Sequence, residues 1–186
     1  MPRIKVTGPD MAEGRLKEIY DELIGKRGKL AAVHQIQSLR PESIALHMDL
    51  YLEIMFSRSG LSRAEREMMA VVVSSANGCG YCKAHHGEAL NHYWKDTEKV
   101  DNLATDFLTL ALSPREMALC RFARLLTLNP MAHEDHDHTD MLRKAGLSDA
   151  DILDAVLVIA YFNFVNRIVL SLGVELEEHQ GKGFKY

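Results

Sequence analysis

Helix-start signals recur along this chain and constrain its fold more than any other feature of the sequence. Each is a Ser or Asp followed three residues later by Glu or Asp, a pattern in which both side chains hydrogen-bond backbone N–H groups at a helix start. The four examples are Asp10 with Glu13, Ser62 with Glu65, Ser113 with Glu116, and Ser148 with Asp151. Apolar residues follow each signal at three- and four-residue spacing, which predicts amphipathic α-helices.

The remaining segments also favour helices over strands. Arg40-Pro41 begins another apolar-periodic segment, and the small residues 57–60 end it. Residues 71–73 are the one β-branched run, but they follow the signal at Ser62 directly, so a buried helix explains them better. We therefore predict an all-α protein of six to nine helices.

The composition indicates one globular domain over residues 1–186, with 47% hydrophobic side chains and a net charge of −4. The charge balance argues against nucleic acid as a partner. The most apolar segment, 152–172, is interrupted by Asp154, Asn163 and Arg167, so we expect a core helix and no membrane partner. The N-terminus has no apolar stretch of signal-peptide length, so we expect a cytoplasmic protein.

A short internal similarity suggests two related helical halves. Leu61-Ser62 aligns with Leu147-Ser148, and Asn77 aligns with Asn163, at a separation of 86 residues. The second half lacks reactive side chains at the positions that correspond to the cysteines of the first. We expect a reactive repeat at about 40–100 and an inert repeat at about 113–175.

The reactive side chains cluster after the break signal Asn77-Gly78, where one helix is predicted to end and the next to begin around Cys79. At about 100° per residue, Cys79, Cys82 and His86 fall within about 60° of one another on the new helix. A helix N-terminus stabilises a thiolate, so this position favours reactive cysteines.

Glu67 precedes the break and comes close to His86 if the turn folds the two helices together. The carboxylate would then orient the imidazole, and His86 could take a proton from Cys82 one turn below it. Cys79 would be the resolving thiol, which condenses with a sulfenic acid on Cys82 to form a disulfide. This arrangement predicts catalytic roles for Cys82, Cys79, His86 and Glu67.

Zinc binding is the main alternative, because Cys79, Cys82 and either His85 or His86 provide three ligands. The cluster His133, His136 and His138 is a second candidate metal site, although a solvated loop explains it as well. A noncatalytic helical oligomer and a general disulfide oxidoreductase also stay open. We assign no cofactor and no metal.

The pattern Glu67-x11-Cys79-x2-Cys82-x3-His86 resembles the signature of the alkylhydroperoxidase AhpD-like, carboxymuconolactone decarboxylase-like superfamily, in particular its peroxidase-related proteins. The resemblance implies an AhpD-like helical bundle and a thiol-dependent peroxidase in which Cys82 attacks the hydroperoxide. It also implies a homo-oligomer (dimer, trimer or hexamer) and a dithiol reductant, in the best-known branch a lipoylated protein. Tyr81 stands where that branch has a histidine, which removes a second histidine relay.

Overall fold

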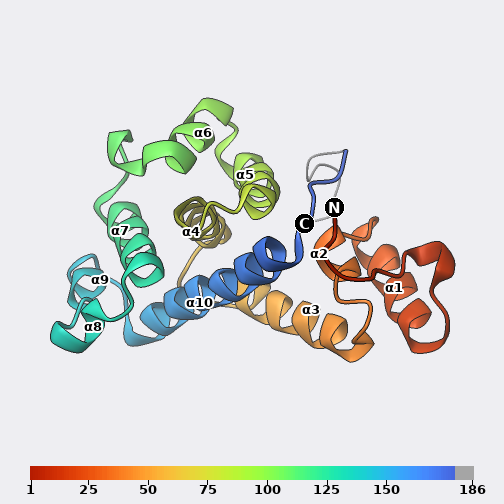
Figure 1. Cartoon of the computed structure of the whole chain (residues 1–186). Coiled ribbons are helices and arrows are strands. Elements are labelled where there is room, and N and C mark those ends of the chain that lie inside the picture. Colours follow the sequence, from red (N-terminus) through yellow and green to blue (C-terminus); the bar gives the residue numbers. More distant parts are fainter. Residues whose placement is uncertain (179–186) are drawn as a thin grey trace.

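The computed structural model describes residues 1–178. Within these residues the secondary-structure elements are all helices, joined by turns and loops. This part of the chain contains ten α-helices and two short 3₁₀ turns (Figure 1). The helices are α1 (Gly14–Arg27), α2 (Ala32–Gln35), α3 (Pro41–Phe56), α4 (Arg63–Ala76), α5 (Gly80–Trp94), α6 (Thr97–Asp106), α7 (Pro114–Leu128), α8 (Ala132–Asp135), α9 (Asp140–Lys144) and α10 (Asp149–Leu172).

The all-α prediction is confirmed, but the number of helices exceeds the predicted six to nine. The difference comes from α2, α8 and α9, which have only four or five residues each. Helices this short do not repeat an apolar face, so periodicity does not reveal them.

Three of the four predicted helix starts are confirmed as complete capping boxes. Ser62, Ser113 and Ser148 each accept the backbone N–H three residues on, and the carboxylate there accepts the N–H of the serine. The fourth prediction, Asp10 with Glu13, is wrong. Asp10 lies in a 3₁₀ turn that starts at Pro9, and α1 begins after Glu13 without a side-chain cap.

The three capped helix starts meet in one region. Arg115, in the first turn of α7, donates to Glu65 in the first turn of α4 and to the carbonyl of Gly60. A Cβ on Gly60 would lie 1.9 Å from a carboxylate oxygen of Asp151, which belongs to the capping box of α10. Only glycine therefore allows the loop before α4 to approach α10 this closely.

Helix α4 is the centre of the bundle. It contacts α3, α5, α6, α7 and α10, and residues 66–74 are all buried (Figure 1). The buried stretch includes the β-branched run 71–73, which is helical as predicted. The cysteine-bearing helix α5 packs directly against α4, so the functional side chains of α5 face the best-buried helix of the fold.

Helix α10 is a core helix of this bundle. Among residues 1–178 it is the one helix whose length and hydropathy would suffice to cross a membrane. Its inner side packs on α3, α4 and α7, and its buried Asn166 donates to Ser74 of α4. Cys120 of α7 is fully buried, as expected for a small core residue.

The two predicted repeats differ where the chemistry lies. Helices α4 and α10 both begin with a capping box, and Asn77 donates directly to its counterpart Asn163. The chain breaks at Asn77-Gly78 after α4, whereas α10 continues without interruption through Asn163. Only the first of these two regions therefore offers a second helix start for reactive side chains.

Candidate functional site

The turn between α4 and α5 positions the cysteines. Gly78 has φ of +68°, a left-handed conformation that favours glycine, and Cys79 follows in an extended conformation as the cap residue of α5. The side chain of Asn77 donates to Asn163 at 3.1 Å and to Asn166 at 2.9 Å, which fastens the turn to α10. The sequence correctly predicts this break.

Cys79 and Cys82 differ in position more than their spacing suggests. The sequence places both cysteines within the first turn of α5, but Cys79 lies just before the helix and only Cys82 lies in it. Both are free thiols and almost completely buried. Cys82 lines a cavity, whereas Cys79 is not one of the lining residues. We predicted that Cys79, Cys82 and His86 share one face of the helix. In the structure only Cys82 and His86 point to the same cavity.

The two thiols interact electrostatically. The thiol of Cys82 donates a hydrogen bond to Cys79, which lowers the pKa of Cys79 to about 7 against the opposing effect of burial. Backbone N–H groups of Cys82 and Tyr81 add to this effect, as expected at a helix N-terminus. Donation to Cys79 and burial raise the pKa of Cys82 well above its usual value. The contact therefore favours the thiolate on Cys79 and the protonated thiol on Cys82.

Glu67, predicted from its register with the cysteines, lies in the centre of the site. Its side chain is fully buried, and its two oxygens have different partners. Oε1 accepts from Arg63 at 2.6 and 2.9 Å, and Oε2 lies 2.7 Å from Nδ1 of His86. Burial raises the pKa of Glu67, but His86 and Arg63 together lower it below its usual value.

The Glu67 contact fixes the proton on His86. An ionised carboxylate only accepts hydrogen bonds, so Nδ1 of His86 must donate to it. The neutral imidazole then has its lone pair on Nε2, the nitrogen that is able to accept a proton. Phe162 holds the ring edge to face at a centroid distance of 4.4 Å. The imidazole is thereby oriented as a base.

Sequence reasoning missed Arg63. Its guanidinium also donates to the carbonyl of Met55 and to the hydroxyl of Tyr51, and it lies 3.5 Å from the ring centroid of Phe56. The sequence does contain a signal for this contact. Arg63 precedes Glu67 by four residues, and residues at i and i+4 lie on the same face of a helix.

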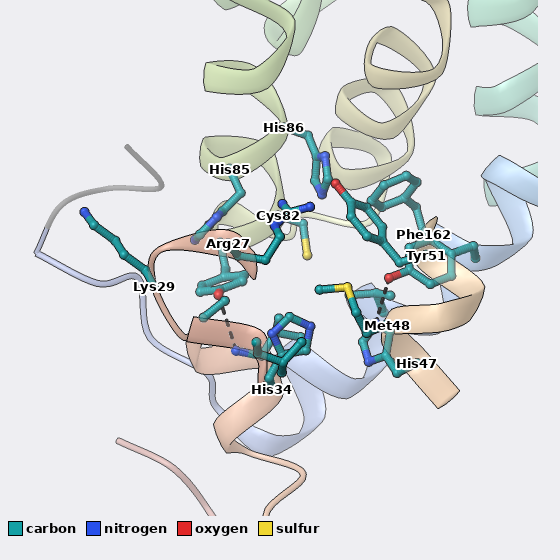
Figure 2. Close-up of a pocket in the computed structure, with 16 residues that line it drawn as sticks. Arg27, Lys29, His34, His47, Met48, Tyr51, Cys82, His85, His86 and Phe162 are labelled. Carbon is teal, nitrogen blue, oxygen red and sulfur yellow. Dashed lines mark hydrogen bonds between the residues drawn. The ribbon is translucent and has the colours of Figure 1, made fainter. Parts of the chain in front are cut away.

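A cavity of about 80 Å³ adjoins Cys82 and His86. Figure 2 shows both side chains projecting from α5 toward it, with Tyr51 and Phe162 beside His86. Met48, Tyr161 and other apolar residues complete its walls. The cavity therefore gives a small molecule a mostly apolar route to the sulfur of Cys82.

Two histidines of this cavity are neutral at physiological pH. Burial is the main cause that lowers the pKa of His34 to about 3 and that of His47 to about 4. The amide nitrogen of Gln37 donates to the carbonyl of Val33 and lies 2.8 Å from Nδ1 of His47, so Nδ1 accepts. Nε2 of His47 therefore donates to the hydroxyl of Tyr161.

Glu177, in the C-terminal segment after α10, binds two lining residues of the cavity, Tyr81 and His85, but does not line the cavity itself. Its carboxylate accepts from the hydroxyl of Tyr81 at 2.9 Å and from the backbone N–H of Ala32 at 2.7 Å, and it pairs with Nε2 of His85 at 2.8 Å. Burial raises the pKa of Glu177, but these contacts lower it to about 2. No local pattern connects Glu177 to α5, so sequence reasoning missed it.

The candidate metal ligands do not form a coordination site. Within residues 1–178, no group of three or more His, Cys, Asp or Glu side chains has the geometry to hold a metal ion. His133, His136 and His138 lie near one another, with ring centroids 4.9 and 5.1 Å apart, in and after the short helix α8. They are remote in sequence from the cysteines and do not line their cavity.

Sequence comparison relates this chain to a known family. Residues 41–125, from α3 into α7, match the carboxymuconolactone decarboxylase family. The matched region contains Glu67, Cys79, Cys82 and His86. The uncharacterized protein YdfG of Bacillus subtilis is 25% identical over 142 residues, which cover 73% of this chain and 90% of that protein.

Solved structures with the same fold extend the similarity to almost the whole chain. The alkylhydroperoxidase AhpD core of an uncharacterized peroxidase-related protein from Ralstonia eutropha has a TM-score of 0.84 at 26% identity, covering 99% of this chain and 98% of that one. A peroxidase-related protein from a Silicibacter species has a TM-score of 0.83 at 27% identity. The match covers 98% of this chain and 100% of that protein. The debrominase Bmp8 in complex with 2,3,4-tribromopyrrole shares the fold, with a TM-score of 0.78 at 21% identity. This match covers 96% of this chain and 95% of that protein.

Proposed function

Because this chain belongs to the AhpD-like, carboxymuconolactone decarboxylase-like superfamily, we propose that it is a thiol peroxidase that reduces hydroperoxides with Cys79 and Cys82. The superfamily assignment by itself suggests an enzyme with peroxidase-related chemistry. One observation carries the finer proposal. Cys82 opens onto a cavity beside His86, whose Nδ1 is held by the buried carboxylate of Glu67.

In the first step, Nε2 of His86 takes the proton of Cys82, and the thiolate attacks the outer oxygen of the hydroperoxide ROOH. The O–O bond breaks, Cys82 becomes a sulfenic acid, and the imidazolium returns the proton to RO⁻, which leaves as the alcohol ROH. In the second step, Cys79 attacks the sulfur of the sulfenic acid. A disulfide forms and water leaves. Two electrons have then passed from the thiol pair to the peroxide.

The cycle needs an external reductant. We propose a dithiol, such as the lipoyl group of a lipoylated protein, which attacks the Cys79–Cys82 disulfide and leaves as its own cyclic disulfide. Both thiols are thereby restored.

The proposed roles of the two thiols follow from their positions relative to the cavity. In the second step Cys79 is the resolving thiol, and the backbone N–H groups of Tyr81 and Cys82 still lower its pKa after the Cys82 thiol has been oxidised. Cys79 does not line the cavity, so a peroxide in the cavity meets Cys82 first. Access therefore favours Cys82 as the peroxide-reactive thiol, even though Cys79 is the stronger acid.

Trapping of the sulfenic acid tests the proposal directly. The reduced protein is treated with one equivalent of cumene hydroperoxide and a sulfenic-acid probe, and the labelled cysteine is identified by mass spectrometry. Cys79→Ser should accumulate label on Cys82 and form no intramolecular disulfide, whereas Cys82→Ser should take up no label. Cys120, which is fully buried, is the internal control. Label on Cys79 in Cys82→Ser at the wild-type rate would reverse the assignment.

The alternatives give different results in the same assay. A general disulfide oxidoreductase would form the Cys79–Cys82 disulfide with an oxidised dithiol but not with a peroxide. A zinc-binding protein would retain about one zinc per chain through dialysis, as structural zinc sites do, and neither thiol would titrate. A noncatalytic helical oligomer would show neither reaction.

We also propose that the protein forms a homo-oligomer through α10 and α3. Leu153, Leu157 and Phe164 project from one face of α10 and are 59%, 41% and 48% exposed. Helix α3 contacts α10 (Figure 1). On α3, Leu46 and Leu50 are 68% and 47% exposed. These five residues are called the α3–α10 surface below. Several large exposed apolar side chains on two contacting helices are typical of protein interfaces.

A further inference from the structure

Two tyrosines, Tyr51 of α3 and Tyr161 of α10, line the same cavity as Cys82. Both side chains are buried, and their ring centroids lie 5.9 Å apart. A tyrosine hydroxyl has one proton to donate and lone pairs that accept. The protein partners of each hydroxyl therefore decide whether its proton is available to a molecule in the cavity.

The hydroxyl of Tyr161 is an acceptor in its protein contact. The amide of Gln37 donates one N–H to the carbonyl of Val33 and the other to Nδ1 of His47, at 2.8 Å each. The neutral ring of His47 then has its proton on Nε2, which donates to the oxygen of Tyr161 at 2.7 Å. This contact does not use the proton of Tyr161.

The hydroxyl of Tyr51 is also an acceptor. A guanidinium has only donors, so Nη2 of Arg63, at 3.3 Å, donates to the oxygen of Tyr51. Within residues 1–178, neither tyrosine hydroxyl donates to a protein group, and no hydrogen bond joins the two hydroxyls. In this part of the chain, both protons are therefore left for a bound molecule.

Burial keeps these protons on the tyrosine oxygens. It is the main cause that raises the pKa of Tyr51 above its usual value and the pKa of Tyr161 well above it. Both hydroxyls are therefore neutral donors at physiological pH. A buried donor without an acceptor costs stability, so such a group calls for an explanation such as a catalytic role or a bound molecule.

Both tyrosines lie beside the reacting groups. The ring centroid of Tyr51 lies 6.5 Å from that of His86, and Figure 2 shows the two side chains next to each other at the cavity of Cys82. Negative charge on Cys82 adds to the burial that raises the pKa of Tyr161, which indicates that this hydroxyl is near the sulfur. A molecule that reacts at Cys82 therefore enters the space that both tyrosines line.

The peroxide reaction creates a charge that suits such donors. When the thiolate of Cys82 takes the outer oxygen of ROOH, the O–O bond breaks and both bonding electrons leave with RO⁻. Hydrogen-bond donors that are already in place stabilise this oxyanion while its charge develops. The imidazolium of His86 supplies the proton that converts RO⁻ to ROH, and the tyrosines keep their protons throughout.

We propose that Tyr51 and Tyr161 are catalytic residues whose hydroxyl groups donate hydrogen bonds to the departing RO⁻. This inference rests on the proposed function and adds an oxyanion-binding site to it. The site accelerates most the reduction of hydroperoxides whose leaving group is a strongly basic alkoxide.

Two aromatic peroxides test the site because their leaving groups differ. Cumene hydroperoxide releases a strongly basic alkoxide, whereas perbenzoic acid releases benzoate, which spreads its charge over two oxygens. Single-turnover oxidation of Cys82 is followed by stopped flow with each peroxide. For Tyr161→Phe and for Tyr51→Phe we expect a loss of about 10²-fold with cumene hydroperoxide, as for one oxyanion donor, and a clearly smaller loss with perbenzoic acid.

Tyr20→Phe is the matched control. It removes a buried hydroxyl of α1 that donates to the carbonyl of Thr7, and Tyr20 does not line the cavity. Both rates should stay at the wild-type level in this variant. If Tyr161→Phe does not fold, Tyr51→Phe gives the same comparison.

The outcomes separate this proposal from the proposed function. Equal losses with the two peroxides would assign the effect to the thiol or to the fold and overturn the proposal, as would wild-type rates in both tyrosine variants. A selective loss in one variant alone would contradict the role of the other tyrosine. In all of these cases the peroxidase stands, because wild-type Cys82 is oxidised. Wild-type Cys82 that reacts with neither peroxide would overturn the proposed function and this inference together.

Discussion

Oε2 of Glu67 lies 2.7 Å from Nδ1 of His86, although the two residues belong to different helices and are 19 positions apart. The contact exists because the chain reverses at Asn77-Gly78 and packs α5 on α4. It keeps the proton on Nδ1 and the lone pair on Nε2. The tautomer of the neutral His86 ring therefore depends on a buried carboxylate that does not line the cavity.

Replacing Glu67 by Gln should invert the His86 tautomer. With the amide oxygen on Arg63, the NH₂ group of Gln would face Nδ1 and make it an acceptor, which moves the proton to Nε2. His86 then cannot take the proton of Cys82. We expect Cys82 oxidation to slow by about 10²-fold or more, as for loss of a general base. Stopped-flow oxidation gives the rate, and ¹⁵N NMR of the imidazole identifies the tautomer.

His86→Ala should slow Cys82 oxidation by a similar factor, about 10²-fold, while the nucleophile remains. His92→Ala is the matched control, because His92 is an exposed residue of the same helix. A wild-type oxidation rate in either Glu67→Gln or His86→Ala would contradict the proposed proton relay.

The sequence predicts those parts of the fold and site that depend on local patterns. The capping boxes at Ser62, Ser113 and Ser148 and the break at Asn77-Gly78 are encoded within a few residues, and the structure confirms them. Arg27 lines the cavity from α1, and Glu177, in the C-terminal segment, binds the lining residue His85. Their position depends on tertiary packing, which leaves no periodic signal in the sequence.

The position of Cys79 shows a second limit. A helical wheel places it on the same face as Cys82 only if both residues have helical dihedral angles. Cys79 is instead extended, with φ of −86° and ψ of 91°. Helix boundaries are the least certain part of a periodicity argument. Here a shift of one residue separates the thiol that lines the cavity from the thiol that does not.

The acidity of Cys79 should depend on the thiol of Cys82. Cys82→Ala removes the hydrogen-bond donor, so the pKa of Cys79 should rise from about 7 toward the usual value for a thiol. Cys82→Ser retains an O–H donor and is the matched control, in which the pKa should stay closer to 7. The thiolate absorbs at about 240 nm, so a pH titration followed at this wavelength gives the pKa of Cys79 in each variant. Equal titration curves for the two variants would contradict the S–H···S hydrogen bond.

The α3–α10 surface should mediate self-association. Leu157→Glu places a charge on this surface, where dissociation avoids the cost of burying it. Sedimentation analysis should show a smaller species than the wild type. Leu108→Glu is the control, because Leu108 is 50% exposed but lies in the 3₁₀ turn after α6. A monomeric wild-type protein, or equal dissociation of both variants, would exclude this surface as the interface.

The contacts of Glu177 should make stability depend on acid pH. Its pKa is about 2 in the folded protein, compared with 4.5 as the ordinary value, so folding favours the carboxylate. This stabilisation is fully present above pH 4.5 and is lost as the pH falls toward 2. Glu177→Gln should reduce the free energy of unfolding by about 2 kcal/mol at neutral pH, the usual worth of hydrogen bonds to a charged group. Urea unfolding from pH 7 downward should show the two curves converging below pH 4.5. Glu178→Gln is the control, because Glu178 is the exposed neighbouring residue, and it should match the wild type at every pH. A difference in the free energy of unfolding between Glu177→Gln and the wild type that does not change with pH would contradict the proposed ionisation.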